Sequence, residues 1–195
     1  MMSEMFDGAV VMSPSPGFGH ADAVLTLAGL LRAAAPPGLR VLSAPFPVRL
    51  GRQTELRPDL LVARYVDLVR DELTAAPLLA VEVRSAGSGL LDRSLKRSVY
   101  ARFRIPSYWL VDPEAPAITA LELDEDGDYA TVAEVVGGQL FVAERPFPVR
   151  VRRSTSSPGC GRADGRRADA VAGSQTCWSI PGTPRSKTPS GGTGC

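Results

Sequence analysis

The chain has 195 residues, 44% of them hydrophobic, and its 22 basic and 21 acidic residues give a formal charge of +1. This length accommodates one domain of ordinary size with a buried core, and the balanced charge gives no overall field that would favour nucleic acid, although a local groove can still be basic. No apolar run approaches the roughly 20 residues that span a bilayer, and the N-terminus lacks the basic and apolar segments of a signal peptide, so we expect no membrane segment and a cytoplasmic location.

The predicted elements of the first half begin with a short strand over residues 8–13, which ends at the proline-rich turn 13–17. A helix is predicted over residues 20–35, because leucines recur at helical spacing and two prolines follow it. Residues 40–50 are predicted to be extended, but their prolines confine them to an edge or a bulge. Residues 57–63 predict a short apolar strand.

The second half alternates again between strands and a helix. Its elements are predicted as a strand over 78–84, a loop over 85–89, a helix from about 90 to 104, strands over 107–112 and 117–123, and a hairpin of 129–136 with 139–143. The helix has an apolar line in which Leu91, Leu95, Val99 and Phe103 recur every fourth residue. Together these elements predict an α/β fold with a central mixed sheet and helices packed on its faces.

The composition changes near Arg152. Residues 153–195 are rich in Gly, Ser, Thr, Pro and Arg and contain almost no Leu, Ile, Val or Phe. Such a segment buries too little apolar area to offset its ordering entropy. We therefore expect residues 1–152 to form the folded domain and residues 153–195 to be a disordered low-complexity tail.

Histidine and cysteine are scarce in this chain. His20 is its one histidine, and its three cysteines all lie in the last fifth of the chain without CxxC spacing. This distribution argues against a zinc site or a disulfide framework. A metal ion would have to be held mainly by oxygen ligands, which favours Mg²⁺ or Mn²⁺.

Charged residues interrupt two of the predicted strands. Asp59 begins one strand directly after Pro58, and Glu82 and Arg84 share one face of the next strand, because alternate side chains of a strand point the same way. An unpaired buried carboxylate costs several kcal/mol. Glu82 therefore calls for a compensating cation or for exposure to solvent.

The helix that follows presents polar residues along one side. Asp92, Lys96 and Tyr100 stand at i, i+4 and i+8. Two carboxylates on adjacent strands and an amine supply what metal-assisted phosphodiester hydrolysis requires, because carboxylates hold the metal and the cation stabilises developing negative charge.

Structural interpretations of the same residues stay open at this point. Glu82 and Arg84 could form an edge pair on a solvated face, and Asp92 with Lys96 could be a surface ion pair contributing a few tenths of a kcal/mol. Tyr100 is of a type that is often half-buried for packing. Asp59 and His20 could simply begin their strand and helix.

The order of these residues resembles a known family. It is the large bacterial family of putative restriction endonucleases, first catalogued as a domain of unknown function, within the PD-(D/E)XK nuclease superfamily. The resemblance covers roughly residues 6–150, and the helix motif followed by Tyr-Trp-Leu-Val-Asp-Pro is its specific part. The matching positions are Asp7-Gly8, Met12-Ser-Pro14, His20, Pro58-Asp59, Glu82-Val83, Ser85, Ser88, Asp92, Lys96, Tyr100 and Tyr108-Trp-Leu-Val-Asp-Pro113.

The resemblance implies a restriction-endonuclease-like fold and Mg²⁺- or Mn²⁺-dependent cleavage of DNA. Carried over by position, Asp59 and Glu82 would be metal ligands and catalytic residues. The lysine of the superfamily normally stands two residues after the glutamate, where this chain has Arg84, so Lys96 takes that role. Arg84 would orient Glu82 or contact a phosphate, since an arginine stays protonated, and Tyr100 would have a supporting role.

Two other functions remain as alternatives. Family members usually carry a glutamate after the N-terminal Asp-Gly, where this chain has Ala9, and this departure favours a catalytically degenerate module that binds DNA or protein. A serine hydrolase ranks third, because the chain has a single histidine and no G-x-S-x-G motif. Cutting both strands of DNA normally calls for two active sites, so a homodimer is a further expectation.

Overall fold

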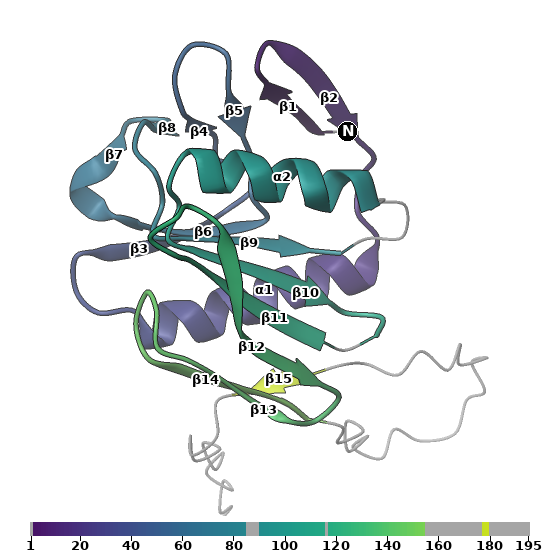
Figure 1. The fold of residues 1–195 in the computed structure, drawn as a ribbon. Helices are drawn as coiled ribbons and strands as arrows, with labels where there is room; N and C mark the ends of the chain where they lie inside the picture. The colour runs from purple at the N-terminus through teal and green to yellow at the C-terminus, as the bar shows by residue number, and fades with distance from the viewer. Residues whose placement is uncertain (1, 85–89, 116, 155–176, 180–195) are drawn as a thin grey trace, which may run out of the picture.

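A central six-stranded sheet organises the computed structural model, which describes residues 2–84, 90–115, 117–154 and 177–179 (Figure 1). Its strands, in spatial order, are β12 (Tyr129–Val136), β11 (Ala117–Leu123), β10 (Ser107–Asp112), β9 (Leu79–Val83), β6 (Leu60–Arg64) and β3 (Leu39–Ser43). Strands β9 and β10 are parallel, and the other neighbouring pairs are antiparallel. The predicted central mixed sheet is therefore confirmed.

Two further sheets complete the strand pairing. The first contains β2 (Ala9–Ser13), β1 (Met2–Phe6), β5 (Glu55–Leu56), β4 (Val48–Arg49), β8 (Glu72–Leu73) and β7 (Leu68–Val69), in that order, and is called the N-terminal sheet below. The second contains β13 (Leu140–Ala143), β14 (Val149–Ser154) and β15 (Cys177–Ser179). A short 3-10 helix, η1 (Tyr65–Asp67), follows β6.

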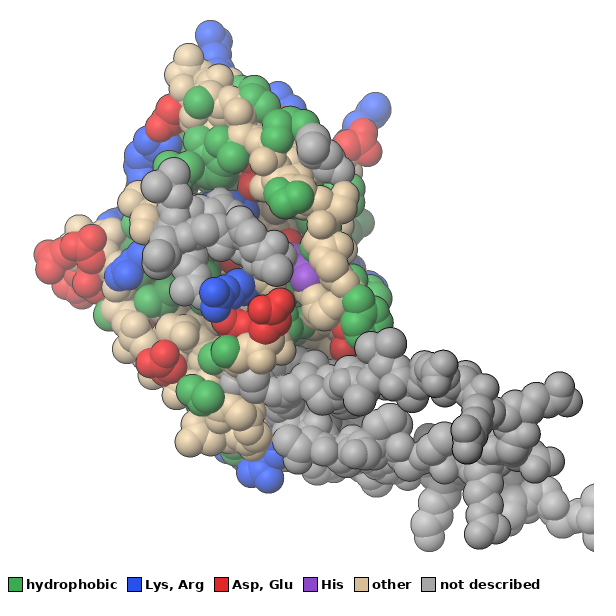
Figure 2. Space-filling view, turned by 90° about the vertical axis from the view of Figure 1, so that its right-hand side faces the viewer, with side chains coloured by type: hydrophobic (Ala, Val, Ile, Leu, Met, Phe, Trp, Pro, Cys, Tyr) green, Lys and Arg blue, Asp and Glu red, His purple; other side chains and the backbone are tan. Residues whose placement is uncertain are grey.

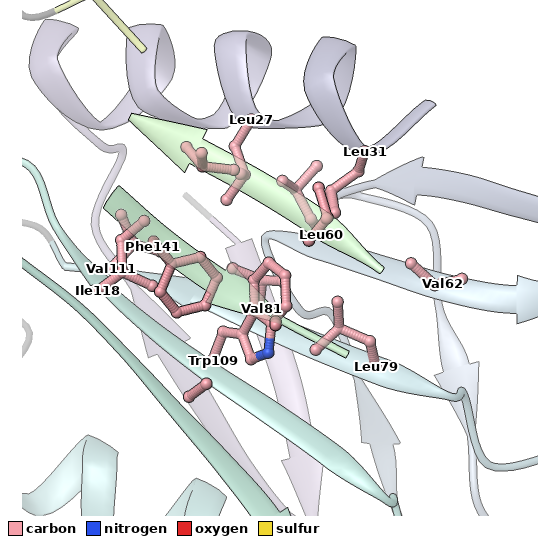
Figure 3. Packing of buried hydrophobic residues seen from close by; sticks show 14 of the residues in the cluster. Leu27, Leu31, Leu60, Val62, Leu79, Val81, Trp109, Val111, Ile118 and Phe141 are labelled. Carbon is pink, nitrogen blue, oxygen red and sulfur yellow. The ribbon is translucent and has the colours of Figure 1, made fainter. Parts of the chain in front are cut away.

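Helix α1 (Phe18–Ala34) covers one face of the central sheet, as the prediction over 20–35 anticipated (Figure 1). Its buried residues Leu27 and Leu31 pack with apolar side chains of the central strands. Figure 3 shows this packing around Trp109, whose ring meets Phe141 edge-on at a centroid distance of 4.9 Å. The helix ends just before the two prolines at 36 and 37, since a proline ring removes a backbone donor and clashes with the preceding turn.

Helix α2 (Leu90–Arg102) lies on the opposite face, together with the N-terminal sheet (Figure 1). Its orientation differs from that suggested by its apolar line. Leu95 is 38% exposed, whereas Lys96 is 5% exposed and Tyr100 is fully buried beside Val99. The helix is turned toward these polar residues because the sheet side offers them charged and hydrogen-bonding partners.

Three further predictions have different outcomes in the structure. The hairpin of 129–136 with 139–143 is wrong, because β12 pairs with β11 while β13 pairs with β14. The extended segment 40–50 is divided into β3 and β4, and β3 does lie at the edge of the central sheet. The predicted loop 85–89 lies outside the described residues.

The predicted tail is described only in part. Residues 153 and 154 belong to the end of β14, and residues 177–179 form β15, which pairs with β14. The rest of residues 155–195 lies outside the description, so the division of the chain at 152 and the disorder of its tail stay predictions. Among the described residues, no helix has the length and apolar character needed to cross a membrane.

Candidate active site

A buried lysine on α2 lies at the centre of the site. Lys96 Nζ is 2.9 Å from Glu82 Oε2 on β9 and 2.9 Å from Glu4 Oε2 on β1. Burial lowers the pKa of Lys96, but the carboxylates of Glu82 and Glu4 outweigh burial and hold this pKa above its ordinary value. The side chain is therefore an ammonium ion over the whole physiological range of pH.

Glu82 receives hydrogen bonds at both oxygens. Its Oε2 accepts from Lys96, and its Oε1 accepts from the Tyr100 hydroxyl at 2.5 Å. Burial raises the pKa of Glu82 to about 8; the Lys96 ammonium opposes this rise, and the nearby Asp59 and Glu4 carboxylates reinforce it. Burial and the charges of Glu82 and Glu4 also raise the pKa of Tyr100, so the phenol keeps its proton and donates a hydrogen bond to Glu82.

Asp59 directly precedes β6, which pairs with the strand that carries Glu82. Its Oδ2 accepts a hydrogen bond from the Val83 backbone N–H at 2.7 Å, and its Oδ1 is 3.2 Å from His20 Nε2 on α1. Burial lowers the pKa of His20, but the hydrogen bond and charge of Asp59 raise it more, so this pKa lies above its ordinary value. The histidine thus orients one oxygen of Asp59 from the opposite side of the sheet.

The structure therefore brings together four of the five predicted residues. They are Asp59 directly before β6, Glu82 on the neighbouring strand β9, and Lys96 and Tyr100 on α2. Arg84 does not join them, because its Nη1 binds Asp112 Oδ2 at 2.6 Å and its side chain is 51% exposed. The alternative of a Glu82–Arg84 edge pair is likewise not what the contacts show, and the side chain of Asp92 lies outside the described residues.

Sequence reasoning missed Glu4. It is 3% exposed, and its Oε1 accepts a hydrogen bond from the Arg57 backbone N–H at 2.7 Å while its Oε2 contacts Lys96. Ala9, where a glutamate was expected, is exposed on β2 and pairs with Phe6 of β1. A carboxylate does reach the site from this hairpin, but it comes from β1. The only signal in the sequence was a single acidic residue within a short apolar segment.

The acidic residues of the site suit a hard divalent cation only in part. The described residues contain no group of three or more His, Cys, Asp and Glu that could hold a metal ion. Two carboxylates on neighbouring strands, Asp59 and Glu82, are nevertheless the usual protein contribution to a Mg²⁺ site, where water and substrate phosphate supply the remaining ligands. The excess of carboxylates over cations around Glu82 adds to this fit.

Figure 2 views the molecule from the side that shows acidic, basic and histidine side chains close together on one surface. Arg84 and Asp112 form a partly exposed ion pair, whereas Lys96 is almost fully buried. The polar residues therefore form two groups that differ in their burial. The ammonium and its carboxylates lie inside, and the Arg84 ion pair lies nearer the solvent.

Comparison with known proteins gives one family and one fold. Residues 1–156 match the family described as "Uma2: Putative restriction endonuclease". No curated protein matches the chain. Among solved structures, the chain is similar to a "putative nuclease belonging to DUF820" from Anabaena variabilis ATCC 29413, with 15% sequence identity and a TM-score of 0.57. This likeness covers 72% of the present chain and 80% of the other, and it shows that the two share a fold.

Proposed function

Because the chain belongs to the Uma2 family of putative restriction endonucleases, we propose that it is a metal-dependent endonuclease that hydrolyses phosphodiester bonds of DNA. The observation that carries the proposal is the buried Lys96 ammonium between Glu4 and Glu82, with Asp59 on the adjacent strand. A buried charge of this kind adds little to stability, since desolvation offsets most of its attraction to a partner. Its arrangement beside two carboxylates is therefore better explained by chemistry.

Asp59 and Glu82 would hold a Mg²⁺ or Mn²⁺ ion. When bound, such an ion polarises the phosphoryl oxygen and lowers the pKa of a coordinated water. Glu82 must be ionised to act as a ligand, and its pKa of about 8 implies that ion binding near neutral pH releases a proton from this residue. Tyr100 fixes the carboxylate by donating to its other oxygen.

Lys96 would stabilise the negative charge that develops on the phosphate as water attacks. A group held protonated by two carboxylates cannot accept a proton from water, so Lys96 acts through its charge and its N–H donors. Glu4 positions this ammonium, and His20 positions Asp59. Metal holding, stabilisation of negative charge and the positioning of these groups thus each have a side chain whose contacts favour that role.

The test is cleavage of plasmid DNA by the full chain with Mg²⁺ or Mn²⁺, compared with the same protein in EDTA. We expect cleavage with metal, none in EDTA, and a loss of at least about 100-fold in the isosteric variants Asp59→Asn and Glu82→Gln. Calorimetry with Mn²⁺ should show weaker binding by both variants. A folded wild-type protein that binds neither metal nor cuts DNA would contradict the proposal and favour the degenerate binding module. Cytoplasmic location and a homodimer stay predictions.

A further inference from the structure

Arg57 stands where the chain passes between the two sheets that build the site. It follows β5 of the N-terminal sheet directly and precedes Pro58, Asp59 and β6 of the central sheet. Glu4 belongs to the first of these sheets, because β1 pairs with β5, whereas Asp59 introduces the second. The relative position of the two carboxylates therefore depends on how these sheets are joined.

The guanidinium of Arg57 bridges three separate segments. It donates to the Ser3 carbonyl through Nη1, to the Pro45 carbonyl through Nε at 3.2 Å, and to Glu55 Oε1 through Nη2 at 2.5 Å. The backbone N–H of the same residue donates to Glu4 Oε1. Its side chain is 22% exposed, so most of the fork is shielded from competing water. Arginine suits this position because its planar fork offers several donors in fixed directions.

We propose that Arg57 is a positioning residue, which fixes Glu4 against the Asp59 segment and so places the Lys96 ammonium relative to the two proposed metal ligands. The inference rests on the proposed function for its catalytic meaning. Arg57 holds the backbone of Ser3 on one side of Glu4 and holds the carboxylate itself through its own N–H. Glu4 in turn holds Lys96, so Arg57 acts on the reaction through two intervening side chains.

Arg49 provides a matched control. It binds the same Glu55, with Nη2 2.9 Å from Oε2, and it also binds Glu72 at 2.8 Å. Both arginines therefore belong to one ion-pair network on the N-terminal sheet. Among the described residues, Arg49 forms its ion pairs with Glu55 and Glu72, neither of which belongs to β1 or to the site, and its side chain is 50% exposed. A general loss of charge pairing on this sheet would affect both variants, whereas loss of positioning would affect only one.

The chain contains two lysines, Lys96 and Lys187, which gives a direct readout of the site. Protein labelled with ¹³C and ¹⁵N in lysine alone should give two sets of side-chain signals, and Lys96→Met assigns them. At one fixed pH we expect Arg57→Gln to move the Lys96 signal in the same direction as Glu4→Gln does. Arg49→Gln should leave it in place. In parallel, kcat for DNA cleavage should fall about tenfold or more in Arg57→Gln with little change in KM, because misplaced groups slow the chemical step.

An unchanged Lys96 signal and a kcat within twofold of wild type in folded Arg57→Gln would overturn the inference. If that variant does not fold, Arg57→Lys decides, since it keeps the charge beside Glu55 but cannot reach three segments at once. A displaced Lys96 signal supports positioning, and a wild-type signal and rate overturn it. The signal requires no activity, so an inert wild-type protein would defeat the proposed function without removing this test.

Discussion

The two faces of the central sheet differ in what they bury. Beneath α1 the packing is apolar, with Leu27 and Leu31 of the helix above Val81 and Trp109 of the sheet (Figure 3). Beneath α2 the apolar cluster also includes tyrosines, and charged groups lie beside it, among them Lys96 at 5% exposure. One sheet thus supports a conventional core on one side and a polar cluster on the other.

This difference indicates that one face of the sheet mainly stabilises the fold and the other carries the reacting groups. Apolar burial contributes about 25 cal/mol for each Å² removed from water, whereas a buried ion pair roughly repays its own desolvation. The α1 face is therefore expected to hold the fold, and the α2 face to hold the reacting groups. Substitutions on the two faces should change different measurements.

The largest expected effect comes from Lys96→Met, which keeps the length of the side chain but removes its charge. We expect DNA cleavage to fall by about 10²- to 10³-fold, because a preorganised charge aimed at the transition state is lost. Initial rates of plasmid nicking measure this, with circular dichroism to confirm folding. The control is Lys187→Met, the chain's other lysine, which lies beyond the family match at 1–156. Equal rates in both variants would remove Lys96 from the mechanism.

The opposite face gives a stability effect of similar size. Trp109 is 1% exposed and packs on Phe141, so Trp109→Ala should lower the free energy of unfolding by about 3–5 kcal/mol. Urea denaturation measures the loss, and the lysine signal of the folded fraction should stay where it is in wild type. A Lys96 signal that moves in Trp109→Ala would mean that the two faces are not independent.

Trp109 and Lys96 also show which features could be predicted from the sequence. Trp109 lies in the segment 107–112, a short apolar run that predicted β10 with its bounds unchanged, because such a run is typical of a strand buried on both faces. Lys96 was predicted from its order after Asp59 and Glu82 in a family motif. Apolar spacing alone pointed to Leu95 as the buried residue, and the structure exposes it.

The missed features depend on contacts between distant segments. Glu4 contacts Lys96 only because β1 pairs with β5 and faces α2. The sequence of residues 2–6 does not indicate that Lys96 is its partner. Strands β5 and β8 have two residues each, too few to show a period. Arg84 was placed in the site from its spacing after Glu82, and its preference for Asp112 arises from β10, which lies 28 residues away in the chain at that point.

A smaller effect is expected from pH. The pKa of Glu82 is about 8 in the folded chain, against an ordinary value of 4.5 for an exposed glutamate, so the folded state holds this proton more tightly. Its contribution to stability is complete below pH 4.5 and is lost as pH rises to about 8, at no more than about 1.4 kcal/mol per pH unit. Metal-free wild type should therefore lose stability between pH 6 and pH 8 in urea denaturation.

Glu82→Gln is the control for this titration, since the amide keeps the shape of the side chain and cannot ionise. Its free energy of unfolding should vary less over the same range of pH. Added Mg²⁺ should restore part of the lost stability to wild type at pH 8 and none to the variant, because a bound ion stabilises the ionised carboxylate. A wild-type protein that becomes more stable between pH 6 and pH 8 relative to Glu82→Gln would contradict the direction of this pKa.

The smallest effect is expected from Arg84→Ala, which tests the boundary between the buried cluster and the surface. Asp112 holds the Arg84 guanidinium, and two backbone N–H groups, from Glu114 and Ala115, bind the other oxygen of Asp112 at 3.0 Å. An arginine tethered in this way can contact a DNA phosphate at the edge of the site but does not hold Glu82. We expect KM for DNA to rise about threefold with kcat unchanged, and the rise to shrink at high salt, because phosphate contacts are screened by ions. Arg84→Lys keeps the charge, and its KM for DNA should lie between those of wild type and Arg84→Ala. If kcat in Arg84→Ala falls as far as in Lys96→Met, Arg84 acts on the reacting phosphate itself. The division into a buried reacting group and a partly exposed Arg84 ion pair is then wrong.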